Sequence, residues 1–168
     1  MELLPGLKEK RVLLIRRIAE IEQAARAAGN PIGAILVDID HFKWGINDVH
    51  GHQFGDQVLI EVAARLFTVA RTDDVMMRIQ SDEFIVVPGV LRSNEELKNQ
   101  ATQILRLFDK PITSGSISAN LGVSIGMAMQ EPGKEPLSLL VLVDKACEQS
   151  KRNGGGRASL HGSDWEAT

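Results

Sequence analysis

The chain has 168 residues, of which 43% are hydrophobic and 24% are charged, and its formal net charge is −3 at pH 7. These values are ordinary for a soluble globular protein, and the length suits one domain with a substantial core. The slightly negative charge excludes a general basic field for nucleic acid, so an anionic ligand must be met by local positive charge.

Cysteine content and apolar runs bear on the cellular setting. The single cysteine, Cys147, excludes an internal disulfide and favours a reducing cytoplasm. It falls on the apolar side of a predicted helix, so we expect core packing rather than reactivity. The apolar runs are shorter than a membrane span, and the N-terminus lacks the layout of a signal peptide. We therefore expect a cytoplasmic chain without a membrane segment.

Hydrophobic periodicity predicts the first elements in chain order. A helix is predicted over residues 7–28, where apolar side chains recur at helical spacing until a Gly-Asn-Pro sequence ends the pattern. A nearly continuous apolar strand over residues 32–39 is typical of a central position in a sheet. The next helix is expected over roughly residues 55–71.

The second half of the chain continues with a β-hairpin over residues 75–79 and 83–88, because two apolar runs flank a short polar tip. The remaining predicted elements are a helix that ends before Pro111, a strand over 120–129, a helix that ends at Asn153-Gly154 and a short strand near 157–161. The order of these elements predicts an α/β (α+β) protein with a mixed central β-sheet flanked by helices.

Two pairs of carboxylates end two of the predicted strands. Asp38 and Asp40 close the first strand, and Asp82 and Glu83 occupy the tip of the hairpin. Adjacent acids repel each other, but their oxygens suit a hard divalent cation. Strand ends also carry acids simply because loops are solvated, so one pair alone is weak evidence. Two pairs together favour a metal-dependent nucleotide site.

Further motifs accompany the acidic pairs along the chain. They are Leu4-Pro5-Gly6-Leu7, Asp38-Ile39-Asp40-His41-Phe42-Lys43, Asn47-Asp48, Gly51-His52, Gly55-Asp56, Arg78, Asp82-Glu83-Phe84, Val123-Ser124-Ile125-Gly126, Asp144-Lys145-Ala146 and Ser150-Lys151 with Gly154. In order and spacing this set resembles the GGDEF domain, the family of the diguanylate cyclases and their degenerate relatives. The resemblance covers residues 2 to about 161.

The resemblance implies the palm-like nucleotidyl cyclase fold. Residues 1–168 would form a single GGDEF-like domain, with a core over about 2–161 and a short tail over 162–168. Many GGDEF domains are the output end of longer proteins, so we expect a covalently linked sensor or effector domain in the full-length protein. A cyclase of this family joins two GTP molecules into cyclic di-GMP, which requires two sites that face each other and implies a homodimer.

The resemblance also implies roles for the acidic pairs. Asp38, Asp82 and the carbonyl of Ile39 are the expected ligands of Mg²⁺ or Mn²⁺, because all are oxygen donors. Such a metal neutralises the triphosphate and lowers the pKa of the attacking hydroxyl. Asp82 and Glu83 are the expected catalytic residues, with Glu83 beside the metal to tune the site or assist proton transfer.

Substrate-binding residues follow from the same resemblance. Asn47 and Asp56 match the guanine-binding pair, and a carboxylate that accepts from guanine N1–H and the exocyclic amine suits a preference for guanine over adenine. Lys43 and Lys151 are candidate phosphate contacts. Without the resemblance, Asp56 is equally well explained as a helix N-cap, and each lysine is more often a solvated surface cation.

An inhibitory product site is the last feature that the resemblance implies. Arg71 and Asp74 form an Arg-x-x-Asp pattern at the family's distance before Asp82, and Arg78 follows. In the family, such an arginine binds guanine or phosphate of a cyclic di-GMP dimer. The alternative is structural, since an arginine at a helix C-terminus is favoured by the helix dipole and pairs with a nearby aspartate.

The signature before the acidic pair departs from the family pattern, which has two glycines where this chain has Gln80 and Ser81. Glycine permits positive φ and a close approach of ligand to backbone. Side chains here would occupy the space of guanine and ribose. A left-handed turn would also cost about 1 kcal/mol for each non-glycine residue.

Other departures concern length. The interval from Asp38 to Asn47 is one residue longer than in the family, with Trp44-Gly45 as the insertion, and this is expected to shift Asn47 out of register with the metal. Two further replacements are Gly154-Gly155-Gly156-Arg157 for the late Gly-Arg of the family and Glu9-Lys10 for its early Asn-Arg.

Three hypotheses follow. The departures favour a degenerate GGDEF domain that binds GTP or cyclic di-GMP, regulates a neighbour and has weak or no cyclase activity. The intact Asp38, Asp82 and Glu83 keep an active diguanylate cyclase as the runner-up. A dimerisation or interaction module that binds no nucleotide is the third.

Overall fold

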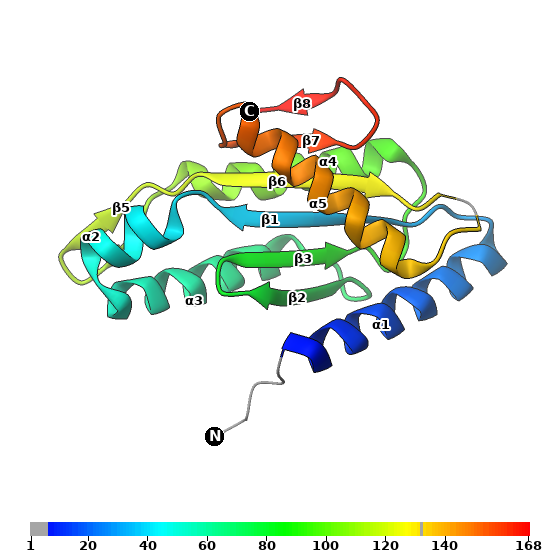
Figure 1. Cartoon of the computed structure of the whole chain (residues 1–168), viewed down its shortest axis with the longest axis horizontal. Coiled ribbons are helices and arrows are strands. Elements are labelled where there is room, and N and C mark those ends of the chain that lie inside the picture. The colour runs from blue at the N-terminus through cyan, green and yellow to red at the C-terminus, as the bar shows by residue number, and fades with distance from the viewer. Residues whose placement is uncertain (1–6, 132) are drawn as a thin grey trace.

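A six-stranded sheet forms the centre of the structure, which is a computed structural model that describes residues 7–131 and 133–168, with side chains in the first helix from Lys10 onward (Figure 1). In sheet order the strands are β2 (Val75–Gln80), β3 (Glu83–Val87), β1 (Gly33–Ile39), β6 (Val123–Met129), β7 (Arg157–Leu160) and β8 (Glu166–Ala167). Only β6 and β7 are parallel, so the predicted mixed sheet is confirmed. The predicted motif Leu4-Pro5-Gly6 lies outside the described residues.

Helices cover both faces of this sheet, as predicted (Figure 1). One face carries α3 (His52–Val69) and α4 (Asn94–Arg106), and the other carries α1 (Leu7–Ala28) and α5 (Pro136–Arg152). Alternate residues of β1 enter the two cores, so Val37 packs on the α3 side and Leu36 on the α5 side. Burial on both faces explains why this strand is a continuous apolar run.

Helix α5 rests directly on β6. A Cβ at Gly126 would overlap the carbonyl of Val143 and the backbone nitrogen of Cys147, so only glycine allows this approach. The thiol of Cys147 is buried and lies 3.4 Å from the carbonyl of Ser124, and burial raises its pKa. Core packing of Cys147 is therefore confirmed. The close contact also fixes where the end of α5 meets the sheet.

Two pairings of short strands were not predicted from the sequence. β4 (Ile112–Ser114) and β5 (Ile117–Ala119) form a separate hairpin, and β8 pairs with β7. The expected tail over 162–168 is thus part of the folded domain, and Trp165 packs against the core under Lys98. Strands of two or three residues are too short to show a period in the sequence.

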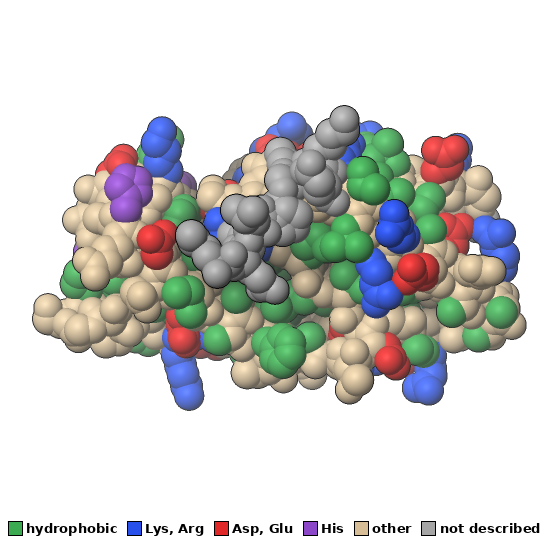
Figure 2. All heavy atoms as spheres, turned by 90° about the horizontal axis from the view of Figure 1, so that it is seen from below, with side chains coloured by type: hydrophobic (Ala, Val, Ile, Leu, Met, Phe, Trp, Pro, Cys, Tyr) green, Lys and Arg blue, Asp and Glu red, His purple; other side chains and the backbone are tan. Residues whose placement is uncertain are grey.

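The surface shows no broad field of one sign on the face drawn in Figure 2. Over the coloured part of this face, acidic and basic side chains alternate with hydrophobic ones. Within residues 7–131 and 133–168, no helix combines the length and the apolar character that a membrane crossing requires.

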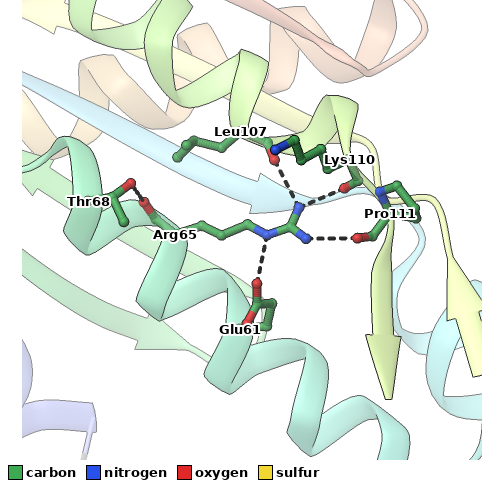
Figure 3. Close-up of polar contacts among 6 residues, drawn as sticks. All are labelled: Glu61, Arg65, Thr68, Leu107, Lys110 and Pro111. Carbon is green, nitrogen blue, oxygen red and sulfur yellow. Dashed lines mark hydrogen bonds and ion pairs between the residues drawn. The ribbon is translucent and has the colours of Figure 1, made fainter. Parts of the chain in front are cut away.

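Arg65 fastens α3 to the chain that follows α4 (Figure 3). Its Nη1 donates to the carbonyls of Leu107 and Lys110 at 2.8 and 2.7 Å, and its Nη2 donates to the carbonyl of Pro111 at 2.8 Å. Nε donates to Glu61 at 2.9 Å. Carbonyls after a helix lack partners within that helix, so one guanidinium satisfies three acceptors at once.

Removing this guanidinium should destabilise the domain. Arg65→Met keeps the aliphatic stem and loses every donor, so we expect the free energy of unfolding to fall by about 1–3 kcal/mol. Urea unfolding measures this change, with Arg16→Met at an exposed position of α1 as the matched control. Equal unfolding midpoints for the two variants would contradict the structural role of Arg65.

Candidate functional site

The ends of β1 and β3 bring the predicted carboxylates together. The antiparallel register pairs Asp38 with Glu83, and the backbone nitrogen of Ile39 donates to the carbonyl of Asp82 at 3.0 Å. Residues that face each other across neighbouring strands have Cβ atoms about 4.5–5.5 Å apart, and like charges at such positions repel. The hairpin tip is therefore held against the end of β1 with three acidic side chains in one place.

Lys151 is the cation of this cluster. Its Nζ lies 2.6 Å from Oδ2 of Asp38, and the two side chains are 39% and 7% exposed. Burial raises the pKa of Asp38, with Lys151 opposing and Asp82 adding to the rise. Burial also works to lower the pKa of Lys151, but the hydrogen bond and charge of Asp38 raise it above its ordinary value. Each charge of the pair therefore favours the ionised form of the other.

Glu83 has the most perturbed carboxyl of the cluster. Burial raises the pKa of Glu83 to about 7, and the charges of Asp38 and Asp82 add to the rise. The charge of Lys151 only partly opposes these effects. A carboxyl with a pKa near neutrality is suited to accept and return a proton.

The donor set fits a small hard cation. No group of three or more His, Cys, Asp or Glu side chains within the described part of the chain is placed to hold a metal ion. Asp38, Asp82 and the carbonyl of Ile39 form a smaller set of oxygen donors at one end of the sheet. Mg²⁺ keeps several waters and takes only one or two protein carboxylates. Burial and, after it, the charges of Asp38 and Asp82 raise the pKa of Glu83, and a cation at this place would offset the effect of those charges.

Asp40 belongs to the fold rather than to this cluster. Its Oδ1 accepts from Ser124 Oγ at 2.6 Å, and its Oδ2 accepts from the backbone nitrogen of Gly156 at 2.8 Å. A Cβ at Gly122 or Gly155 would lie within 2.8 Å of Oδ2. Asp40 therefore fastens the end of β1 to the start of β6 and to the α5–β7 turn.

The segment around Trp44, where the sequence predicts one extra residue, forms a π-helix, η1 (Phe42–Asn47), which a short helix, α2 (Asp48–His50), follows. A π-helix accommodates one residue more per turn than an α-helix, and such insertions are frequent at functional sites. The side chain of Asn47 packs against Gly55, where any Cβ would overlap its Oδ1. Asn47 thus contacts the buried glycine that precedes Asp56 in α3.

Asp56 and Lys43 are both exposed to solvent. Because α3 begins at His52 and has Gly51 as its N-cap, the alternative interpretation of Asp56 as an N-cap is wrong. The guanidinium of Arg157 has other partners: its Nε donates to the carbonyl of Gly155 at 3.0 Å, and its Nη1 lies 3.7 Å from Glu166.

The hairpin tip does not need glycine. Gln80 pairs with Glu83 across a two-residue turn, with an irregularity after Arg78. Among the described residues His41 alone is a non-glycine residue at positive φ, so Gln80, Ser81 and Asp82 avoid the left-handed region. The expected strain at Gln80 and Ser81 is therefore absent, and both side chains are exposed.

Asp74, of the predicted inhibitory site, faces inward. Its carboxylate is 1% exposed and accepts from the backbone nitrogens of Arg71 and Gly89 at 2.9 and 3.1 Å. It also accepts from Nε2 of Gln100 at 2.9 Å, a buried partner that the sequence-based analysis missed. A glutamine on the apolar side of α4 could have indicated a buried polar partner such as Asp74. Arg71 is 51% exposed, and Arg78 is exposed too, so both guanidinium groups can reach a ligand.

Comparison with known proteins identifies relatives over the whole chain. The family described as "Diguanylate cyclase, GGDEF domain" matches residues 3–157. The chain is 32% identical over 170 residues to "Diguanylate cyclase DosC" of Escherichia coli K12, covering 100% of this chain and 35% of DosC. It is 32% identical over 154 residues to "Response regulator PleD" of Caulobacter vibrioides, covering 90% of this chain and 34% of PleD. The chain thus spans about a third of the length of these curated relatives.

Solved structures agree with this assignment. The GGDEF domain of YfiN (TpbB) from Pseudomonas aeruginosa superposes with a TM-score of 0.86 at 28% identity, covering 92% of this chain and 96% of that one. The GGDEF domain of DgcB from Caulobacter crescentus, in complex with c-di-GMP, gives a TM-score of 0.81 at 30% identity and covers 95% of each chain. The predicted α/β fold with a mixed sheet is therefore shown by its neighbours as well as by its own strands.

The carboxylate cluster makes stability depend on pH. Because the pKa of Glu83 is raised from 4.5 to about 7, the folded state holds this proton more tightly than the unfolded state does. The free energy of unfolding should therefore fall as pH rises from about 4.5 to about 7. Glu83→Gln should flatten part of this slope, measured by urea unfolding across this range. Glu20→Gln, at an exposed position of α1, should leave the slope unchanged.

Proposed function

Because the chain belongs to the GGDEF family of diguanylate cyclase domains, we propose that it binds GTP together with Mg²⁺ or Mn²⁺ and cyclises it weakly or not at all. The observation that carries this proposal is the cluster of Asp38, Asp82 and Glu83 around Lys151. The cluster lies beside a hairpin tip that has side chains at the two positions where the family signature has glycine. The domain would act in cyclic di-GMP signalling as a nucleotide-dependent regulator of a covalently linked neighbour.

Different residues of the chain would bind the guanine, the phosphates and the metal ion. Asn47 and Asp56 would accept and donate along the edge of guanine, with Gly55 leaving room for them. Lys151, already half-exposed at Asp38, would reach the triphosphate, and Lys43 would contact it from η1. The divalent ion, held by Asp38, Asp82 and the carbonyl of Ile39, would neutralise the phosphates and acidify the attacking hydroxyl.

Proton transfer would depend on Glu83, and product formation would depend on a second copy of this domain. Glu83 has a pKa of about 7, so its carboxylate would accept a proton from the ribose 3′-hydroxyl in the turnover that remains. Each 3′-hydroxyl attacks the α-phosphate of the other GTP, so two domains must face each other. Gln80 and Ser81 stand beside this cluster, where their side chains would hinder ribose and guanine.

An active diguanylate cyclase is the second candidate, and the unstrained tip favours it. The turn at Ser81 and Asp82 keeps its backbone out of the left-handed region, and the carbonyl of Asp82 remains bonded to Ile39. The proposed metal ligands would therefore be presented without backbone strain at the tip. An interaction module without nucleotide is the third candidate, and it predicts no thermal shift with GTP and Mg²⁺.

Restoring the glycines separates these candidates. If side-chain bulk limits the reaction, Gln80→Gly/Ser81→Gly should raise cyclic di-GMP formation at least about tenfold, equivalent to about 1.4 kcal/mol of barrier. Turnover of GTP with Mg²⁺ is measured by chromatography on the domain fused to a dimerising coiled coil. Asp82→Ala in the restored variant should abolish the product. High turnover by the unaltered chain would instead establish the active cyclase.

Cyclic di-GMP binding tests the inhibitory site, which the DgcB complex with c-di-GMP supports by similarity. Arg71→Ala removes an exposed guanidinium and should weaken cyclic di-GMP binding by about 1.5–3 kcal/mol, measured by calorimetry. The matched control is Arg106→Ala, an exposed arginine at the end of α4. Wild-type affinity in Arg71→Ala would leave Arg71 with the structural role of an arginine after a helix.

A further inference from the structure

Lys151 and the proposed metal ion need the same carboxylate. Nζ of Lys151 lies 2.6 Å from Oδ2 of Asp38, and the Asp38 side chain is only 7% exposed, so little of it is open to a second cation. Because Mg²⁺ binds oxygen at about 2.0–2.1 Å, an ion on Oδ2 would lie close to the ammonium. Two cations at such a distance in a half-buried site repel each other. The geometry therefore opposes binding of both at Asp38.

The ammonium also has the electrostatic effect that a metal ion would have on these carboxyl groups. Burial raises the pKa of both Asp38 and Glu83, Asp82 adds to the rise, and Lys151 opposes it at both. A bound divalent cation would oppose the rise in the same way. Lys151 thus already balances part of the negative charge that attracts the ion.

The backbone of Lys151 is anchored, whereas its side chain is mobile enough to leave. The preceding residue, Ser150, is fully buried, and its Oγ donates to the carbonyl of Ile125 at 2.7 Å and lies 2.7 Å from Oγ of Ser159. The Lys151 side chain is 39% exposed, and Oε1 of Glu148 lies 3.5 Å from its Nζ. A lysine carries a compact charge on a flexible stem. Nζ can consequently change partners without any movement of α5.

The phosphates of a nucleotide offer Lys151 another anionic partner. Under the proposed function, on which this inference rests, Lys151 contacts the triphosphate while the ion binds Asp38 and Asp82. Lysine forms charge-assisted hydrogen bonds with phosphate as well as with carboxylate. An ammonium that moves to the phosphates therefore keeps an ionic partner and uncovers Oδ2 of Asp38. When one ligand removes the competitor of another, the two bind cooperatively, and the coupling is reciprocal.

We propose that Lys151 is an internal counter-ion that competes with the divalent ion for Asp38, so that nucleotide and metal bind cooperatively. In the nucleotide-free domain the ammonium holds Asp38, and the ion binds weakly. When the triphosphate binds, Lys151 moves to the phosphates and the ion replaces the ammonium on Oδ2. The carboxylates have a cation beside them in both states.

Removing the ammonium should strengthen metal binding without any nucleotide. Electron paramagnetic resonance, which reports free Mn²⁺, measures the affinity of the unaltered chain and of Lys151→Met, which keeps the aliphatic stem. We expect Lys151→Met to bind Mn²⁺ at least about tenfold more tightly, as is usual for coupled ligands. Lys151→Arg keeps a cation and should bind Mn²⁺ as weakly as the unaltered chain. Arg152→Met, at the next and exposed position of α5, removes the same charge and should leave the affinity unchanged.

Asp82→Ala and GTP distinguish a missing competition from a missing metal site. If Lys151→Met and the unaltered chain bind Mn²⁺ equally tightly, and Asp82→Ala abolishes this binding in both, the site stands and the competition is wrong. Mn²⁺ binding that requires GTP in both proteins would lead to the same conclusion. Failure of both proteins to bind Mn²⁺ even with GTP would contradict the metal site and the competition together.

A second measurement uses the unaltered chain, because Lys151→Met leaves a buried carboxylate without its partner. Acetylation by acetic anhydride, located by mass spectrometry, is slow for an amine held in an ion pair. Mg²⁺ should accelerate acetylation of Lys151 several-fold, because the ion displaces the ammonium from Asp38. Acetylation of Lys110, an exposed lysine after α4, should not change. If Lys151 responds to Mg²⁺ no more than Lys110 does, the ammonium does not compete with the ion and the proposal is overturned.

Discussion

The ion pair between Lys151 and Asp38 depends on core packing that lies some distance from the charges. Apolar pairs such as Ile35 with Val86 and Val37 with Phe84 fix the register of β1 and β3. A slip by one residue would turn each side chain to the other face of the sheet, so the same register that buries the core sets Asp38 opposite Glu83. Gly126 then lets α5 descend onto β6, which brings Lys151 to the carboxylates. Burial of apolar side chains thus maintains a concentration of negative charge that would otherwise be unfavourable.

The two predicted departures at Trp44-Gly45 and at Gly154-Gly155-Gly156-Arg157 fall in different structural settings. Trp44 lies inside a π-helical segment, whose wider turn can accommodate an extra residue, and Asn47 lies against Gly55. The turn between α5 and β7 is anchored by Asp40, and Arg157 lies in β7 with its guanidinium toward Glu166. The first setting keeps the Asn47 side chain against Gly55, and the second directs the guanidinium of Arg157 to Gly155 and Glu166.

Much of the fold could be predicted from the sequence because its signals are long and local. Helix α1 carries its apolar spacing over six turns and ends at glycine, and β1 is buried on both faces. The acidic cluster was also predictable, since it follows from which strands end in carboxylates. The Arg65 contacts and the inward turn of Asp74 depend on partners distant in sequence, and neither has a local pattern. The π-helix escaped prediction because its geometry follows from packing Phe42 and Ile46 into the same core.

The conformation of the hairpin tip bears on what the glycines of the family signature are for. If the turn needed a left-handed backbone, Gln80 and Ser81 would show it, but neither has positive φ. The fold therefore accepts side chains at both positions without strain, and the backbone bond between Asp82 and Ile39 is kept. Since the backbone here does not require glycine, the proposed effect of Gln80 and Ser81 is steric: their side chains would take space from a nucleotide. Side chains at this tip should consequently change ligand binding and turnover while they leave the stability of the domain almost unaltered.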